Sequence, residues 1–98
     1  MEVYKQIKTG EIAGSATAAQ MPNVPCQMVM FKAVASITGD VYIGPAGVTV
    51  PDGTADATSG LELSPGQFSP WIPIDNLNRL YLICDNATDD LTYIALQG

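Results

Sequence analysis

The sequence contains no histidine, and only four of its 98 residues are basic. Without an imidazole base, the Ser–His and Cys–His pairs of nucleophilic enzymes are excluded. Two cysteines, Cys26 and Cys84, cannot complete a tetrahedral zinc site on their own. Calcium, bound by the Asp-rich loops, is the remaining metal alternative, but those loops lack EF-hand spacing and such residues commonly form turns. The sequence therefore predicts a protein that is not an enzyme and that needs no cofactor.

Charge is also sparse, and it is mostly negative. The net charge is −6, and charged residues make up 14% of the chain, against about 25% in an ordinary domain. Nucleic acids and anionic membrane surfaces both attract clusters of basic residues, so neither is an expected partner. Because so little of the surface can be strongly solvated, we expect it to be buried against other protein chains in a homo-oligomer or a larger assembly.

Long apolar runs are missing too. None approaches the roughly 20 residues that span a bilayer. The first ten residues, MEVYKQIKTG, lack the pattern of a secretion signal, so we expect the chain to stay in the cytoplasm where it is made. Both cysteines lie in apolar stretches, which predicts buried free thiols, with a disulfide as the alternative if their strands are neighbours.

No stretch has a clear helical pattern. The best candidate, residues 14–21, is alanine-rich but short, and Pro22 and Pro25 follow it. We expect residues 9–25 to form an extended N-terminal arm or loop, with one helical turn as the alternative. The arm would belong to a single domain that spans residues 1–98, because a chain of this length supports one core.

Short strand patterns recur instead, separated by turn residues. They lie at 2–9, 26–36, 41–44, 47–50, 61–63, 67–74, 79–85 and 90–97. Pro70 and Pro73 place the strand at 67–74 at a sheet edge, with Phe68 and Ile72 in one phase. The last two strands flank Asn-Ala-Thr-Asp and predict a hairpin. The sequence thus predicts an all-β fold, a single antiparallel β-sandwich or jelly roll of about seven or eight strands, with a small β-barrel as the alternative.

The glycine-rich stretch GDVYIGPAGVTVPDG, residues 39–53, resembles a ligand-binding loop at first sight. A phosphate loop, however, joins a strand to a helix and ends in Gly-Lys-Ser/Thr, whereas this one returns to β-branched residues. We therefore interpret its glycines and prolines as turn formers.

The run from Cys26 to Ser36 is apolar in both phases of a strand. Val29, Phe31, Ala33 and Ala35 suit a core face, so Met28 and Met30 point to the other side, where a monomer should carry polar groups. Either a second layer of the same chain or another subunit must cover them. Met28 and Met30, together with Trp71, are the predicted interface residues.

Aromatic residues allow a different interpretation. Trp71 with Tyr4, Tyr42, Tyr81 and Tyr93 would serve as a sugar-stacking platform in a carbohydrate-binding module. We favour packing in the core and at interfaces, where such rings commonly lie.

From Val24 to Leu96 the order of elements resembles small β-rich structural proteins of tailed-bacteriophage virions. The resemblance rests on NVPCQMVMFKA, GDVYIGPAGVTV, SGLELSPGQ and NLNRLYLICDNATDDLTYIAL. Such proteins include capsid decoration proteins, head-fibre bases and small tail components. The shared motifs are structural turns, so no functional residue is carried over.

The resemblance implies a structural virion protein, assembled in a bacterial cytoplasm and placed on the capsid surface. Its partners would be the major capsid protein or other virion proteins, and copies of itself, with a trimer at local three-fold axes as one arrangement. A tail or baseplate component is the alternative within the same particle.

Overall fold

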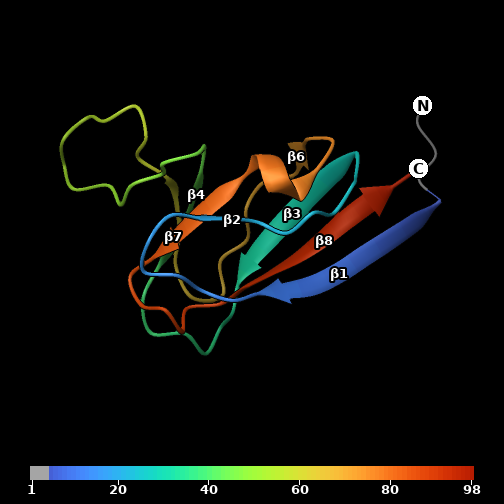
Figure 1. The fold of residues 1–98 in the computed structure, drawn as a ribbon. Coiled ribbons are helices and arrows are strands. Elements are labelled where there is room, and N and C mark those ends of the chain that lie inside the picture. The colour runs from blue at the N-terminus through green and yellow to red at the C-terminus, as the bar shows by residue number, and fades with distance from the viewer. Residues whose placement is uncertain (1–4) are drawn as a thin grey trace.

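A computed structural model describes residues 5–98 and shows two four-stranded antiparallel sheets packed together (Figure 1). The strands are β1 (Gln6–Ile12), β2 (Ala19–Gln20), β3 (Met28–Ala33), β4 (Val41–Gly44), β5 (Leu61–Leu63), β6 (Ile72–Pro73), β7 (Tyr81–Cys84) and β8 (Leu91–Gln97). The β3 sheet has the order β1-β8-β3-β6, and the β4 sheet has the order β2-β7-β4-β5. The predicted all-β fold is confirmed. One turn of 3-10 helix, η1 (Leu77–Arg79), precedes β7.

The core lies between the two sheets and follows from alternation along the strands. In β3 the side chains of Val29, Phe31 and Ala33 are fully buried, and those between them are only partly buried. β8 repeats the pattern, so its inward residues meet those of the β4 sheet. The core cluster comprises Ile12, Met21, Val24, Cys26, Val29, Phe31, Ala33, Val41, Ile43, Leu63, Leu77, Leu82, Cys84, Leu91, Tyr93 and Ala95.

Both thiols are buried and free, as predicted. Cys26 donates to the carbonyl of Ile74 at 3.2 Å, and Cys84 donates to the carbonyl of Asp89 at 3.3 Å. Burial raises the pKa of each thiol, which keeps it protonated and poorly nucleophilic. No helix among residues 5–98 is long and apolar enough to cross a membrane.

Two strand limits differ from the prediction. β3 ends at Ala33, and Ala35 is exposed rather than part of the core face, because the chain turns where the Ile37 N–H donates to the Val34 carbonyl at 3.2 Å. β1 runs over Gln6–Ile12 rather than residues 2–9, of which residues 2–4 lie outside the described chain.

The predicted hairpin between the last two strands is wrong. β7 pairs with β4 and β2, whereas β8 pairs with β1 and β3, so the chain crosses from one sheet to the other at Asn86–Asp89. The side chain of Asp89, fully buried, accepts hydrogen bonds from the Asn86 N–H at 2.9 Å and the Gly39 N–H at 3.3 Å. This carboxylate fixes the turn as a crossover, since it ties it to the loop before β4.

The segment before β6 contains a β-bulge, which also corrects the predicted phase. Lys32 pairs with Phe68, but Val29 pairs with Ile72, so the segment has one residue more than β3 over the same length. Phe68 and Ile72 consequently lie on opposite sides of the sheet: Phe68 is 57% exposed, and Ile72 packs against the core. β6 lies at a sheet edge, as its prolines predicted.

The predicted arm, residues 9–25, is built into the sandwich. Its first residues belong to β1, residues 19–20 form β2, and Ile12, Met21 and Val24 are buried in the core. No helical turn forms at residues 14–21. The predicted arm is therefore part of the folded domain rather than a free extension.

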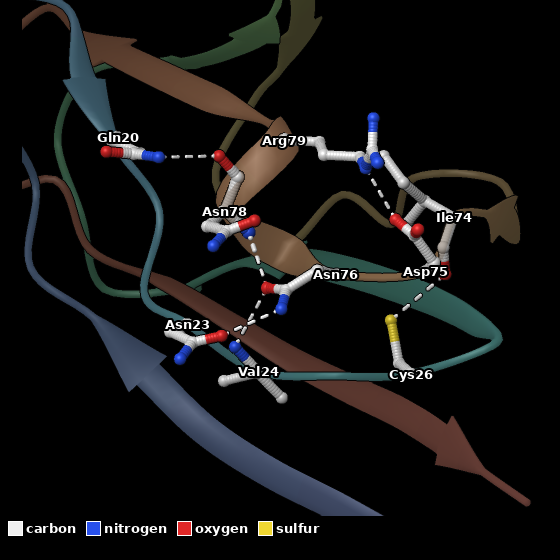
Figure 2. Close-up of polar contacts among 9 residues, drawn as sticks. All are labelled: Gln20, Asn23, Val24, Cys26, Ile74, Asp75, Asn76, Asn78 and Arg79. Atoms are coloured by element: carbon white, nitrogen blue, oxygen red, sulfur yellow. Dashed lines mark hydrogen bonds and ion pairs between the residues drawn. The ribbon is translucent and has the colours of Figure 1, made fainter.

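Asn76 ties the end of this segment to the rest of the fold (Figure 2). Its Oδ1 accepts hydrogen bonds from the N–H groups of Val24 and Asn78, both at 3.0 Å, and its Nδ2 donates to Oδ1 of Asn23 at 2.7 Å. Nearby, Gln20 donates to the Asn78 carbonyl at 2.8 Å. The Asn76 side chain thus caps η1 and anchors the loop between β2 and β3.

Replacing Asn76 by Ala should lower the free energy of unfolding by about 1–3 kcal/mol, because two backbone N–H groups lose their acceptor. Asn23→Ala is the matched control. It removes only the exposed side-chain contact and should cost less than about 0.5 kcal/mol. Equilibrium unfolding in urea measures both, and equal losses in the two variants would contradict this role of Asn76.

Candidate protein-binding surface

The predicted interface residues Met28 and Met30 lie on the outward side of the β3 sheet. Directly paired residues share a side of a sheet, so the register identifies their neighbours. Met28 is paired with Leu96 of β8 and Pro73 of β6, and Met30 is paired with Ile94 of β8. The alternate positions of β3 point into the core.

The pairing of β8 with β1 extends this side to the edge of the sheet. Leu96 pairs with Ile7, and Ile94 pairs with Thr9. Ile7 is 61% exposed, and the methionines, Ile94 and Leu96 are partly exposed. We call the six apolar residues on this side the outer face: Ile7, Met28, Met30, Pro73, Ile94 and Leu96.

The outer face is organised as rows that run across the strands. Its first row, Ile7, Leu96, Met28 and Pro73, is apolar across all four strands. The second row contains Ile94 and Met30. Apolar side chains on neighbouring strands thus lie next to one another, and they are not scattered singly over the sheet.

A third, more polar row bounds the outer face. It contains Glu11, Thr92, Lys32 and Phe68, paired in that order across β1, β8, β3 and the segment before β6. The Lys32 ammonium lies 5.0 Å from the centre of the Phe68 ring, a cation–π contact. Glu11 and Lys32 therefore lie at the end of the sheet away from the apolar first row.

Glu11 faces a second carboxyl group, that of Asp90. The Gly14 N–H donates to Asp90 at 2.9 Å. This bond lowers the pKa of Asp90, and the hydrogen bond and negative charge of Asp90 raise the pKa of Glu11. The pair joins the end of β1 to the start of β8.

Trp71 lies in the bulge beside the second row. Pro70 and Trp71 together stand opposite Met30, and Trp71 is 41% exposed. The bulge is held by Ser69, a buried residue whose hydroxyl accepts the Phe31 N–H at 2.8 Å and donates to the Pro70 carbonyl at 2.9 Å. The structure thus brings Trp71 to the strand edge next to Met30, while Met28 and Met30 share one face.

The outward side of the β4 sheet is different in character. Tyr42 lies there but is only 5% exposed, and its hydroxyl donates to Asp85 at 3.1 Å. A side chain at Gly44 or Gly60 would collide with Val48, which is itself buried, so these glycines let the loop after β4 close over the sheet. The chain itself thus covers Tyr42 and Val48, while Tyr81 and Ile83 on the same side are partly exposed.

The aromatic residues do not gather as a sugar platform requires. Tyr93 is buried in the β3 sheet, Tyr42 and Tyr81 belong to the β4 sheet, and Trp71 stands at the β6 edge. Tyr4 lies outside the described residues.

Residues 5–98 contain no group of three or more acidic or cysteine side chains placed to hold a metal ion. In the loops considered for calcium, Asp89 binds backbone N–H groups and Asp85 accepts the Asp40 N–H at 2.9 Å. These carboxylates stabilise turns, as Asx residues commonly do.

Comparison with protein-family models, curated proteins and solved structures found no match to the chain.

Sequence reasoning missed most of the outer face. Ile7, Ile94 and Leu96 were not named as interface residues, although Tyr-Ile-Ala-Leu at 93–96 is apolar in both phases, as residues 28–31 are. Two strands that are each apolar in both phases, and that pair with each other in one sheet, are the pattern that would have identified this surface.

Tyr42 should titrate late. Burial, and then its hydrogen bond to Asp85, raise its pKa from 10.0 to about 12. Since the neutral phenol is favoured only in the folded state, its contribution to stability is complete below pH 10 and is lost as pH rises to about 12. Ultraviolet titration should show a late phase in the wild type that is lost in Tyr42→Phe; identical titration of the two proteins would contradict the assignment.

Proposed function

We propose that this chain is a structural protein of a tailed-bacteriophage particle, and that it attaches to the capsid surface as an accessory stabilising protein. The observation that carries the proposal is the outer face, an apolar surface on a sheet whose other side already supplies the core. Exposed apolar surface of this kind commonly marks a protein–protein contact. The low charge of the chain supports close packing between subunits.

The protein would stabilise the particle by burying the apolar area of its outer face against the capsid. Covering apolar area stabilises an assembly by about 25 cal/mol per Å² removed from water. Partly exposed residues such as Met28 and Ile94 have less area left to bury than a free side chain. Each copy therefore contributes modestly, and many copies bound across neighbouring capsid subunits together resist the pressure of packaged DNA.

The order of motifs in the sequence also supports a virion protein. The stretches of residues 23–33, 39–50 and 59–67 that carry the resemblance form β3, β4, β5 and the turns around them. The Ser64–Gln67 turn is one example: the Gln67 N–H donates to the Ser64 carbonyl at 2.9 Å, and Gly66 has a φ of 80°. The residues that carry the resemblance thus form strands and turns of the fold, whereas the outer face is the surface we propose for attachment to the capsid.

Replacing both Met28 and Met30 by Lys should abolish binding to the particle and leave the chain folded, because both side chains point outward. Thr54→Lys with Ala57→Lys is the matched control, since it adds the same two charges in the exposed loop at 51–58. Co-sedimentation with particles should show at least about a tenfold loss of affinity for the first variant, equivalent to 1.4 kcal/mol, and none for the control.

Wild-type binding by the methionine variant would refute the proposal. If that variant unfolds, its methionines belong to the core, and Ile7→Lys, at a position that is 61% exposed, tests the same face. Imaging of virions with a labelled copy separates the locations: signal over the whole shell is expected, whereas signal at one vertex would indicate a tail component.

A further inference from the structure

The four sheet edges of the sandwich are unequally protected. β6 has two residues, with Pro73 in the strand and Pro70 in the bulge before it; β5 has three residues, and β2 has two. β1 has seven residues, no proline and an unbroken register with β8. Long regular edges present unpaired backbone groups that can pair with another strand, and native proteins usually shorten or block them. β1 has only the charged Lys8 and Glu11 as such protection and is the longest and most regular of the four edges.

The surroundings of β1 leave that edge accessible. It is the terminal strand of the β3 sheet, and Figure 1 shows no element beyond it. Its residues from Gln6 to Thr9 are all exposed. Because backbone groups of alternate residues point away from β8, about half of the strand can accept a further partner.

We infer that β1 pairs with β1 of a second copy of this chain, in antiparallel orientation, so that two β3 sheets join into one. The two-fold axis is then perpendicular to the sheet, and the two outer faces lie on the same side. Only registers that place outward residues opposite outward residues satisfy this symmetry.

One register uses the whole strand. With Thr9 opposite Thr9 of the second copy, Gln6 pairs with Ile12, Ile7 with Glu11, and Lys8 with Gly10, so all seven residues of β1 are matched. A Thr–Thr pair on the axis is favourable in an antiparallel ladder. The two neighbouring allowed registers match fewer residues: one sets Lys8 opposite Lys8, which places like charges together, and the other sets Gly10 opposite Gly10.

Charge also favours a second copy as the partner. β1 and the preceding residue contain Lys5, Lys8 and Glu11, so half of the basic residues of an acidic chain lie along this edge. In the Thr9 register Lys5 is diagonal to Glu11 of the second copy, within reach of a long side chain. The two edges are thus complementary on the outward side, whereas on the opposite side Lys8 of each copy is diagonal to Lys8 of the other.

This inference does not depend on the phage proposal. In the Thr9 register the rows that contain Thr9, Ile94 and Met30 become continuous between the copies, and the apolar first row of each copy continues into the third row of the other. The proposed dimer forms through the backbone edge of β1, whereas particle attachment uses outward side chains of the β3 sheet. Experiments can therefore refute one proposal and leave the other standing.

A cysteine pair tests the register in the full chain. Thr9→Cys should form a disulfide-linked dimer under mild oxidation, because the two sulfurs meet on the axis. Ile7→Cys is the matched control on the same strand and side. In this register its two copies lie about 13 Å apart, beyond the reach of a disulfide. Non-reducing electrophoresis should show about tenfold more cross-linked dimer for Thr9→Cys, with buried Cys26 and Cys84 contributing no background.

Wild-type chain measured by sedimentation velocity should dimerise as its concentration rises. Hydrogen exchange should show protection gained in β1 and not in β5, a readout that needs no substitution. A chain that remains monomeric throughout, equal cross-linking of the two cysteine variants, or a dimer without protection of β1 would each overturn the inference.

Discussion

The constraint on which the structure depends is that β3 and β8, neighbours in the middle of one sheet, are apolar on both sides. Their inward residues, Val29 and Phe31 on β3 and Leu91 and Ala95 on β8, are fully buried. Their outward residues cannot be buried by the same sandwich, because the β4 sheet packs against only one side. Residues 5–98 form these two sheets, and no third strand layer among them covers these residues. The inward apolar side of β3 and β8 thus stabilises the fold, and the outward apolar side lies on the surface of the sandwich.

Polar groups decide which strands meet. Asp89 directs the chain after β7 across to the other sheet, and Asn76 holds the loop after β2 against η1. Ser69 supplies a hydroxyl where the bulge withdraws a backbone acceptor from Phe31. Buried polar side chains are costly unless they are hydrogen-bonded, so each of these residues fixes one local geometry. Together these residues help to set the order of the strands, which hydrophobic burial alone would not determine.

The sequence predicts the parts of this structure that depend on local pattern. Alternation identified the two sides of β3 and the placement of Met28 and Met30, and Pro70 and Pro73 identified an edge strand. Leu61–Leu63 and its Pro-Gly turn were located correctly.

What depends on long-range contacts was not predictable. The turn at 86–89 has the length of a hairpin connection, and long-range bonds such as the one from the Gly39 N–H to Asp89 hold it as a crossover. The bulge at Pro70 and Trp71 changes the phase of the strand without any change in hydrophobic pattern. The full outer face follows from pairing between β1, β8 and β3, which no single stretch of sequence contains.

Oxidation of the methionines tests most directly whether another protein covers the outer face. Met21 is 2% exposed and serves as an internal standard, while Met28 and Met30 lie partly exposed on the outer face. In the purified chain, peroxide should convert Met28 and Met30 to sulfoxides well before Met21, and mass spectrometry resolves the three sites. In the assembly isolated from its natural source, all three should react equally slowly. Outer-face methionines that stay as reactive in that assembly as in the purified chain would contradict the account.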